Sequence, residues 1–240
     1  MKGIVLAGGT GTRLGVLTKV VNKHLLPVYD RPMIFYPIQI LVSSGITSIM
    51  IVTDKRRAGD FMNLLGSGRE FGARFTYGLQ DEASGIADAI YIAKDFVNND
   101  DVTVILGDNV FLGKIPLVNR VDGKGRIYLK REKESYRFGV AVVKKGSITD
   151  LVEKPADNIS DLVVTGLYQY PPDVFGFIEK LRPSHRNEVE VTDLNRAYLK
   201  ESRLSYKILK NKWVDAGTVQ SLYDAQRMVK KYQKALGNIK

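Results

Sequence analysis

A short apolar run near the start of the chain, residues 4–6, leads directly into a segment rich in glycine, residues 8–13. Glycine has no Cβ, so its backbone adopts conformations closed to other residues and approaches a ligand closely. Successive bare N–H groups bind anions, and Arg13 adds a fixed positive charge. A strand that ends in such a loop is a common phosphate-binding site in α/β proteins. The beginning of the chain therefore predicts an α/β fold with a phosphate-bearing ligand.

Two widespread glycine-rich motifs do not fit this loop. A dinucleotide fingerprint, Gly-x-Gly-x-x-Gly, would start at Gly9 and Gly11, but its third glycine would fall on Leu14. A Walker A loop needs a lysine directly after its last glycine, and the loop has none there. A surface turn with a chance arginine is the alternative without a function.

Composition narrows the class of protein. A chain of 240 residues with 44% hydrophobic side chains suits one large α/β domain, or one domain with a small appendage. The absence of cysteine excludes disulfides, thiolate metal sites and cysteine nucleophiles. No apolar stretch is long enough to span a membrane, and no secretory signal precedes the first strand. We therefore expect a cytoplasmic protein.

The chain is basic, with a formal net charge of +10. Such a balance is compatible with nucleic acid, an anionic surface or small polyanionic substrates. The positive residues are densest at 124–133, at 144–145 and at 227–234, and aromatic residues do not interleave with them as in a single-strand channel. Solvated faces are the favoured interpretation, and nucleic-acid binding is the alternative.

Apolar runs alternate with helical patterns through the first half of the chain. The predicted strands are residues 4–6, 49–53, 74–79 and 102–106, and the predicted helices are 32–44, 57–65 and 86–96. This alternation predicts a Rossmann-like, mixed and mainly parallel sheet with helices on both faces. The second half has predicted strands at 126–130, 138–143, 147–152, 161–170 and 204–209, and helices at 172–181, 191–201 and 219–236.

Two aspartates follow apolar segments and lie close to glycines. Asp108 comes after the strongest predicted strand and Gly107, and Asp215 follows Val214 and precedes Gly217. Ligands of open α/β sheets collect at the carboxyl ends of strands, and carboxylates hold Mg²⁺ against phosphates. The two carboxylates would supply a magnesium site if they are adjacent in space. An Asx turn or a helix cap is the structural alternative.

Other polar residues stand at the ends of predicted elements. Gln80 ends a strand, and its amide suits the imide edge of thymine or uracil, with a bare N–H of Gly85 for the remaining carbonyl. Glu153 could accept sugar hydroxyls, and Lys154 could meet a sugar phosphate. The alternatives are a solvated glutamine and an exposed ion pair.

Four further residues have a structural interpretation. Glu190 and Asp193 lie with Arg186 around the start of a predicted helix, where we favour the two acidic residues as caps. The histidines, His24 and His185, are not spaced as metal ligands, and we expect packing or surface roles for both.

A series of motifs runs in order along almost the whole chain. These are residues 6–14, Lys23, residues 25–28, residues 32–34, Gln80, Gly85, residues 107–109, 138–140, 153–155, 165–168, 190–193 and 215–218. The series resembles the sugar nucleotidyltransferase family, whose signature Leu-Ala-Gly-Gly-x-Gly-Thr-Arg-Leu matches residues 6–14. Within that family it is similar to the short form of the glucose-1-phosphate thymidylyltransferases.

The resemblance implies a nucleotide-diphospho-sugar transferase fold in a single domain, and it implies residue roles. Residues 1–110 would bind the nucleotide, 111–218 the sugar phosphate, and 219–240 would form a C-terminal helix. The implied catalytic residues are Arg13, Lys23 and Asp108, and Asp108 and Asp215 would bind Mg²⁺. The implied nucleotide-binding residues are Leu6, Gly8, Gly9, Thr10, Gly11, Thr12, Arg13, Lys23, Gln80, Gly85 and Asp108. The implied sugar-phosphate residues are Asn109, Gly139, Glu153, Lys154, Val164, Thr165, Tyr168, Arg186 and Asp215.

The implied reaction joins dTTP and α-D-glucose 1-phosphate to give dTDP-glucose and pyrophosphate, by in-line attack at the α-phosphorus with Mg²⁺. Transfer from UTP or another nucleotide is the alternative, and a non-catalytic nucleotide-sugar-binding domain is a weaker one. We expect small-molecule substrates, no nucleic acid, no membrane partner and a homo-oligomer. The chain departs from the family pattern at Gly15-Val16, where a proline is common, and at Asp88, where glutamine is usual. The first departure predicts a looser far end of the loop.

Overall fold

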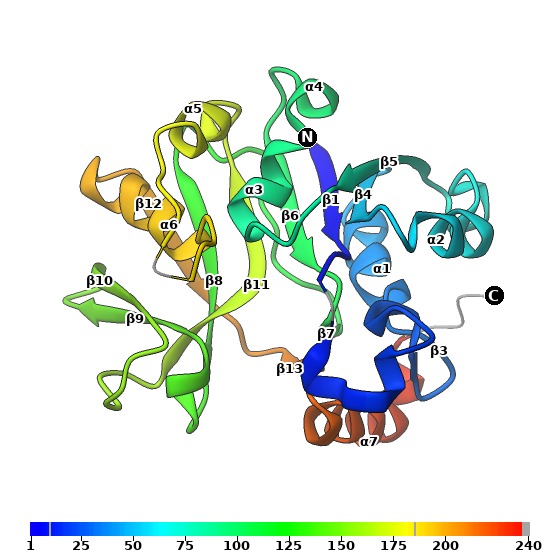
Figure 1. The fold of residues 1–240 in the computed structure, drawn as a ribbon. Coiled ribbons are helices and arrows are strands. Elements are labelled where there is room, and N and C mark those ends of the chain that lie inside the picture. Colours follow the sequence, from blue (N-terminus) through cyan, green and yellow to red (C-terminus); the bar gives the residue numbers. More distant parts are fainter. Residues whose placement is uncertain (10, 185, 237–240) are drawn as a thin grey trace. The chain divides into compact units, whose positions relative to one another are not determined.

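The protein is described by a computed structural model that covers residues 1–9, 11–184 and 186–236 (Figure 1). The chain divides into two compact units. The glycine-loop unit comprises Gly3–Ala83, Ile105–Leu117 and Asn211–Lys240. The Glu153 unit comprises Met1–Lys2, Ser84–Val104 and Val118–Lys210. Each unit therefore combines segments that are distant in the sequence.

Parallel strands form the sheet of the glycine-loop unit. β1 (Lys2–Leu6) pairs with β4 (Ser48–Asp54), and β4 pairs with β5 (Arg74–Gln80), with all three in the same direction (Figure 1). The C-terminal end of β6 (Val102–Leu106) lies on the other side of β1, where Gly107 N donates to Leu6 O at 2.8 Å. Successive residues of β1 and β4 are buried, as both faces of a covered parallel sheet require.

The helices of this unit follow its strands. They are α1 (Phe35–Ser43), α2 (Ala58–Leu65) and the 3₁₀ turns η1 (Thr12–Thr18), η2 (Lys23–Leu25) and η3 (Arg69–Phe71). A short ladder joins β2 (Pro27–Val28) to β3 (Arg31–Pro32). The predicted helix at 32–44 begins only at Phe35, because Pro32 pairs with Pro27 in this ladder.

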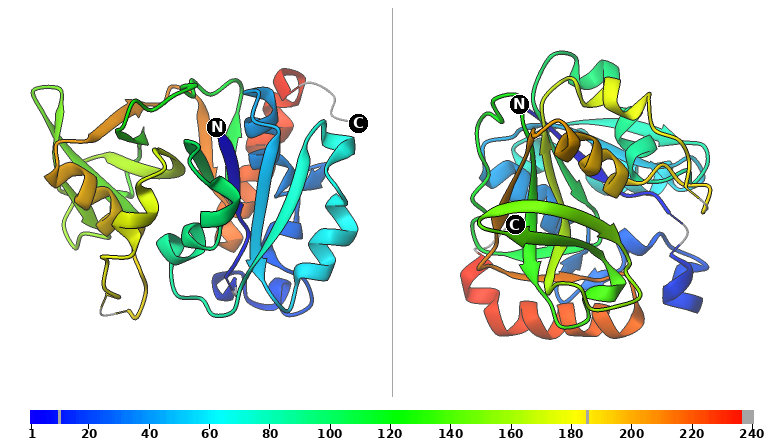
Figure 2. Two further views of the ribbon diagram at one scale, coloured as in Figure 1. Left: turned by 90° about the horizontal axis from the view of Figure 1, so that it is seen from above. Right: turned by 90° about the vertical axis from the view of Figure 1, so that its left-hand side faces the viewer.

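A second ladder and the last helix complete the glycine-loop unit. β7 (Asn109–Leu112) pairs antiparallel with β13 (Lys212–Asp215), and α7 (Val219–Leu236) packs against both as one unbroken helix (Figure 2). Leu222, Ala225 and Val229 on α7 join a core that also contains Leu14 and Tyr36. The sequence predicted α7 but neither strand of the ladder.

The Glu153 unit contains a mostly antiparallel array in the order β10–β9–β11–β8–β12. Its strands are β8 (Gly125–Arg131), β9 (Gly139–Lys144), β10 (Ser147–Glu153), β11 (Leu162–Tyr170) and β12 (Leu204–Ile208), and only β12 runs parallel to its partner, β8. Its helices are α3 (Ile86–Tyr91), α4 (Lys94–Val97), α5 (Val174–Ile178), α6 (Val191–Lys200) and the 3₁₀ turn η4 (Ser135–Arg137). β6 also belongs to this unit through Val102–Val104.

The predicted fold class, a mixed and mainly parallel sheet with helices, is confirmed. Of the fifteen predicted strands and helices, fourteen lie close to their predicted positions. The helix predicted at 86–96 was wrong as a single helix. It divides into α3 and α4 because Ala93 N bonds Ile90 O, three residues back, and Ala93 leaves helical geometry. Within the described part of the chain, every helix is too short or too polar to cross a bilayer.

A buried amide ties the Glu153 unit together. Gln169 Oε1 accepts from Tyr128 OH at 2.5 Å and from Val118 N at 3.1 Å. Its Nε2 donates to Thr103 Oγ1 at 3.0 Å and to Val118 O at 2.9 Å. One side chain on β11 thereby satisfies polar groups from β6, β8 and a loop, and buried polar groups that have hydrogen-bond partners cost little free energy.

Replacing this amide by an isosteric hydrocarbon tests the network. Gln169→Leu leaves several buried polar groups without a partner, and each such group costs about 1–3 kcal/mol. We expect the free energy of unfolding to fall by at least about 2 kcal/mol in urea titrations. The matched control is Gln220→Leu on the exposed surface of α7, which should change it by less than about 0.5 kcal/mol. Equal losses in the two variants would contradict the interpretation.

Candidate functional site

The glycine-rich loop follows β1 and has the conformation that its sequence predicts. Ala7 N still bonds Val52 O at 2.7 Å, and the chain then turns through Gly9 (φ 95°) and Gly11 (φ 66°). Positive φ at both positions is available to glycine at little cost. Thr12 starts the 3₁₀ turn η1, whereas Thr10 lies outside the described residues.

Arg13 lies beside a glycine from the other end of the sequence. A Cβ on Gly217 would come within 2.9 Å of Arg13 Nη2 and 2.8 Å of Asp215 Oδ1. The guanidinium and the carboxylate therefore occupy the space that a side chain at Gly217 would fill. Glycine at this position allows the positive group of the loop to approach Asp215.

Lys23 and Asp108 form a buried ion pair. Lys23 Nζ lies 2.5 Å from Asp108 Oδ2, and Asn109 Nδ2 donates to Asp108 Oδ1 at 3.0 Å. The two charged side chains are 14% and 9% exposed. Burial alone would raise the pKa of Asp108, but the charge and hydrogen bond of Lys23 outweigh it and hold that pKa well below its usual value. Asp108 is thus ionised.

The ladder of β7 and β13 brings the second aspartate to the first. Asp215 faces Asn109 in the register, and Ala216 N bonds Asp108 O at 2.9 Å. Burial and the neighbouring charge of Asp108 raise the pKa of Asp215 to about 6. Asp215 Oδ1 also accepts from Gly217 N at 2.9 Å, so the Asx turn considered for Asp108 occurs at Asp215 instead. The adjacency that the sequence could only suggest is present.

This centre is supported by three further side chains, which were given no role in the site by the sequence analysis. Asn22 Oδ1 accepts from His24 N at 2.9 Å and lies 2.8 Å from His24 Nδ1, which orients the residues on either side of Lys23. Trp213 Nε1 donates to Asn109 Oδ1 at 2.7 Å. His24 is 1% exposed, and burial and Lys23 lower its pKa to about 3. Its predicted packing role is confirmed; His185 lies outside the described residues.

Gln80 is at the end of β5, close to the glycine loop. Its Oε1 lies 3.0 Å from where a Cβ on Gly8 would stand, and the residue is 7% exposed. A pocket of about 310 Å³ is lined by Gly9 and Gln80 together with residues 54–56 and 81–83. The glutamine amide and the glycine loop therefore share one cavity in the glycine-loop unit.

Glu153 is the centre of the polar cluster in the Glu153 unit. Glu153 faces Gly139 across the β9–β10 ladder, and Thr192 Oγ1 donates to Glu153 Oε2 at 2.6 Å. Lys154 Nζ and Arg186 Nη2 each lie 3.6 Å from Glu153 Oε1. Lys154 has a φ of 44°, which is a costly conformation for a residue with a side chain.

The predicted capping role of the acidic residues at α6 was wrong. Glu190 occupies the N-cap position, but its side chain caps no backbone N–H. Its Oε1 instead accepts from Arg186 Nη2 at 2.7 Å and from Ser184 Oγ at 2.9 Å. Asp193 binds Arg196 at 3.3 Å. Arg186, a stronger donor than a backbone amide, takes the carboxylate of Glu190.

Of the remaining predicted residues of this unit, Thr165 and Tyr168 are buried. Thr165 is fully buried and donates its hydroxyl to Tyr128 O at 2.8 Å, and Tyr168 stacks on Tyr170. A Cβ on Gly85 would lie 2.5 Å from Val189 O, so only glycine fits there. Asp88 accepts from Ser84 Oγ at 2.5 Å. Ligand contacts by these residues, and by Leu6, Gly139 and Val164, stay predictions.

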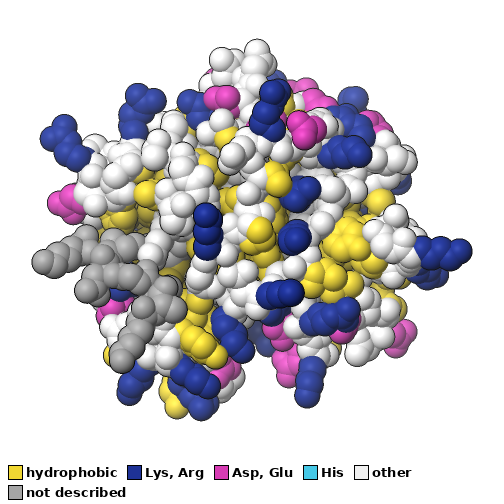
Figure 3. Space-filling model, turned by 180° about the vertical axis from the view of Figure 1, so that it is seen from behind, with side chains coloured by type: hydrophobic (Ala, Val, Ile, Leu, Met, Phe, Trp, Pro, Cys, Tyr) yellow, Lys and Arg dark blue, Asp and Glu magenta, His cyan; other side chains and the backbone are white. Residues whose placement is uncertain are grey.

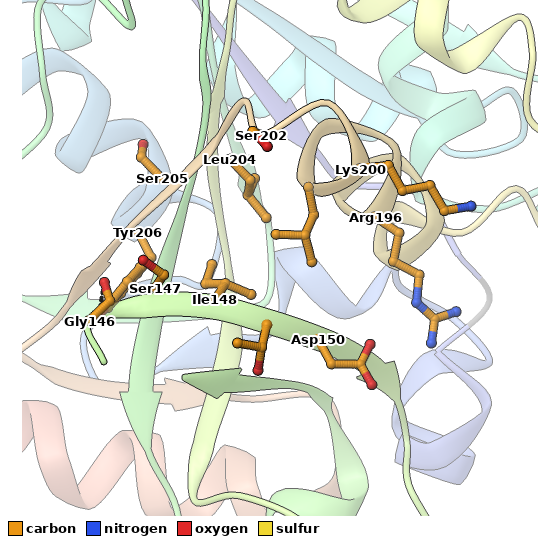
Figure 4. A pocket seen from close by; sticks show the side chains of 12 residues that line it. Gly146, Ser147, Ile148, Asp150, Arg196, Lys200, Ser202, Leu204, Ser205 and Tyr206 are labelled. Atoms are coloured by element: carbon orange, nitrogen blue, oxygen red, sulfur yellow. Dashed lines mark hydrogen bonds between the residues drawn. The ribbon is translucent and has the colours of Figure 1, made fainter. Parts of the chain in front are cut away.

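A larger hollow in the Glu153 unit carries none of this chemistry. It measures about 1030 Å³ and lies over β10, β12 and α6, with Arg196 and Lys200 on the helix and Asp150 on the strand (Figure 4). Its lining has no glycine-rich loop, and none of the predicted site residues takes part. Size alone therefore does not identify the functional site.

Surface charge does not point to another site either. On the face shown in Figure 3, the described Lys and Arg side chains are spread among hydrophobic and acidic ones and form no single continuous patch. This distribution favours solvated charges on that face. Among the described residues, no cluster of three or more His, Asp or Glu could hold a metal ion.

Comparison with known proteins supports the interpretation of these motifs. The nucleotidyl transferase family matches residues 2–232. A glucose-1-phosphate thymidylyltransferase of Neisseria gonorrhoeae is 41% identical over 241 residues, covering 97% of this chain and 84% of that protein. One from Xanthomonas campestris pv. campestris strain B100 is 39% identical, with 98% and 83% covered.

Solved structures agree. A Bacillus anthracis protein assigned as a glucose-1-phosphate thymidylyltransferase, in complex with sucrose, has a TM-score of 0.91 and 46% identity, with 95% of this chain and 94% of that one covered. A UDP-glucose pyrophosphorylase complexed with UDP-glucose has a TM-score of 0.82 and 27% identity, with 96% and 98% covered.

The buried ion pair allows a test of stability that needs no substrate. Lys23→Met leaves Asp108 buried without its partner, and breaking such a pair costs about 3–5 kcal/mol. We expect that loss of unfolding free energy in urea titrations. The double variant with Asp108→Asn should lose less than the sum of the two single variants.

An exposed pair provides the control. Arg131 Nη1 and Asp161 Oδ2 are 2.6 Å apart, with side chains 63% and 49% exposed. Arg131→Met should cost less than about 1 kcal/mol. Additive losses at Lys23 and Asp108 would show that the two charges do not stabilise each other.

Proposed function

The chain belongs to the nucleotidyl transferase family, and we propose that it is an enzyme that joins dTTP and α-D-glucose 1-phosphate. One observation carries the proposal: Arg13, at the end of the glycine loop, and Lys23 lie beside the two aspartates, Asp108 and Asp215. A cation-lined anion site with ionised oxygen ligands is what transfer between polyanions requires.

In the proposed reaction, a phosphate oxygen of the sugar 1-phosphate bonds to the α-phosphorus of the nucleotide. The bond from that phosphorus to the bridging oxygen breaks, and diphosphate leaves with the electron pair. The nucleophile is already an anion, so no general base has to take a proton. His24, buried and held neutral, fits a reaction without such a base.

Repulsion between the two substrates is the main barrier that the protein has to lower. Two unit charges 4 Å apart cost about 1 kcal/mol in water and about 4 kcal/mol at an effective dielectric constant of 20. Several such pairs together reach roughly ten kcal/mol. Arg13, Lys23 and the amides of the glycine loop would offset this repulsion around the triphosphate. Positioning of the reactants contributes up to about 7–11 kcal/mol more.

Asp108 and Asp215 fit a divalent cation. Both offer carboxylate oxygens, which Mg²⁺ prefers, and the raised pKa of Asp215 reflects burial and a second carboxylate nearby. We propose that these residues hold Mg²⁺ with the nucleotide, where the cation neutralises phosphate charge. Lys23 would keep Asp108 ionised for that purpose.

The cluster around Glu153 suits the sugar phosphate. The Glu153 carboxylate, oriented by Thr192 and facing Gly139, would accept sugar hydroxyls. Lys154 and Arg186 would supply positive charge for the phosphate. Arg186 is already bonded to Glu190, so the phosphate would compete for a guanidinium with several donors. Assembly into a homo-oligomer and a cytoplasmic location stay predictions from the sequence.

Transfer from UTP to the same sugar phosphate is the second candidate. The likeness to a UDP-glucose pyrophosphorylase over 96% of the chain favours it. The imide edge of uracil is the same as that of thymine, so the amide of Gln80 would accept both bases. The thymidylyl activity is preferred because relatives of that name reach 41% identity.

A matrix of nucleotides against sugar phosphates tests the proposal. The purified chain with Mg²⁺ should release diphosphate fastest with dTTP and glucose 1-phosphate, and more slowly with UTP. Arg13→Ala should lower kcat by about 100-fold or more, because a charge aimed at the transition state is lost. No diphosphate from any pair would contradict the proposal.

Glycine variants serve as a sharper comparison in the same assay. Gly217→Ala places a Cβ in the space of Arg13 and Asp215 and should also lower kcat. Gly59→Ala, where a Cβ meets no atom within 4 Å, is the matched control and should leave kcat unchanged.

The metal assignment has its own test. Asp215→Asn retains an oxygen that can accept from Gly217 N but removes the charge. We expect the Mg²⁺ concentration for half-maximal turnover to rise more than tenfold. Asp224→Asn on α7, where the carboxylate accepts from Gln220 Nε2 at 3.3 Å, is the control and should not change it. Identical metal titration curves for wild type and Asp215→Asn would remove Asp215 from the metal site.

A further inference from the structure

The segment that follows the glycine loop makes a sharp bend that depends on one glycine. Gly15 (φ 59°, ψ −127°) interrupts the 3₁₀ turn η1, in a conformation that side chains disfavour. Val16 and Leu17, which come next, are 73% and 40% exposed. The bend therefore obtains little stabilisation from packing at its tip.

Thr18 connects the two sides of this bend. Its Oγ1 lies 3.0 Å from Gly11 O and 3.2 Å from Gly15 O, so one hydroxyl proton is shared between two carbonyls. Its Cγ2 lies 2.8 Å from where a Cβ on Gly11 would stand. The methyl group thus occupies the space that glycine leaves, and the hydroxyl closes a ring from Gly11 to Thr18.

Two other contacts hold the ends of the same segment. Leu14 is 1% exposed within the core, and its N–H bonds Gly11 O at 2.9 Å. Arg57, at the start of α2, donates to Val20 O at 2.9 Å and to Lys19 O at 3.2 Å. Between these anchors, Thr18 is the side chain that joins the bend to the glycine loop.

We propose that Thr18 is a positioning residue for nucleotide transfer: it clasps residues 11–18 and thereby fixes the direction of the Arg13 guanidinium. The inference rests on the proposed function for its kinetic consequence. Arg13 lies inside the clasped segment and beside Asp215. A small rotation of the segment would move the guanidinium away from the place where phosphate charge develops.

Two replacements separate the hydroxyl from the methyl group. Thr18→Val keeps the shape and removes the hydrogen bonds, and Thr18→Ser keeps the hydroxyl. Thr149→Val is the matched control, because Thr149 Oγ1 also donates to a backbone carbonyl, Val142 O at 3.2 Å, on an exposed surface. Trypsin cleavage after Arg13 and Lys19 reports on the segment without any substrate.

We expect trypsin to cut Thr18→Val after Lys19 at least fivefold faster than wild type, with the melting temperature unchanged. In the same variant, kcat/KM for the nucleotide should fall about tenfold, and KM for the sugar phosphate should stay within twofold. Thr18→Ser should restore most of both values, and Thr149→Val should match wild type.

Unchanged cleavage in Thr18→Val would overturn the clasp, and faster cleavage with unchanged nucleotide kinetics would overturn the positioning role. A general fall in melting temperature, with equal effects on both substrates, would show a merely structural residue. If the wild type transfers no nucleotide, the proposed function fails, and the trypsin comparison still decides whether Thr18 holds the segment.

Discussion

The pairing of β7 with β13 determines the chemistry of the glycine-loop unit. It places Asp215 in register with Asn109, next to Asp108 at the end of β6. Two neighbouring carboxylates repel each other, and burial, together with this repulsion from Asp108, raises the pKa of Asp215. The two carboxylates therefore need positive charge beside them, and it can come from the protein, from a bound cation or from both.

The protein supplies part of that charge by bringing in distant segments. Lys23 reaches Asp108 from η2, which Asn22 begins by accepting a hydrogen bond from His24 N. Arg13 and Asp215 both lie against the space that the missing side chain of Gly217 leaves. Breaking a buried ion pair leaves an uncompensated charge, so the partners of each charge matter for stability. Gly217 leaves the space that Arg13 and Asp215 occupy, and Asn109 donates to Asp108.

The sequence predicted those parts of the site that depend on local pattern. Gly9 and Gly11 lie in a turn, and Asp108 lies just beyond the end of the buried strand β6, because loop composition and strand hydrophobicity are local signals. The adjacency of Asp108 and Asp215 depends on a ladder of two four-residue strands, which are too short to leave a periodic signal. Contacts between distant side chains, such as Thr192 with Glu153, leave no pattern at all.

The predicted capping role of Glu190 was wrong because a carboxylate can serve several roles. Glu190 stands at the start of α6, where a carboxylate caps helices, but Arg186 binds it more strongly than a backbone amide would. Thr165 has a hydroxyl suited to a sugar, and in the structure that hydroxyl donates to Tyr128 O inside the core, so its contact with the sugar stays a prediction. Local sequence identifies the chemical group, whereas its partner is decided by which other groups the fold brings within reach.

At the bend around Gly15, contacts with other parts of the fold stand in for the proline that is common at this place. Proline would restrict the conformations of the unfolded chain and favour a single bend. Gly15 and Val16 do not restrict the chain in this way. The expected loosening is opposed by contacts from outside the bend: Leu14 in the core and Arg57 on the carbonyls of Lys19 and Val20. Proline acts mainly on the unfolded chain, but these contacts exist only in the folded one. The order of this bend consequently depends on tertiary structure rather than on a stiff residue within it.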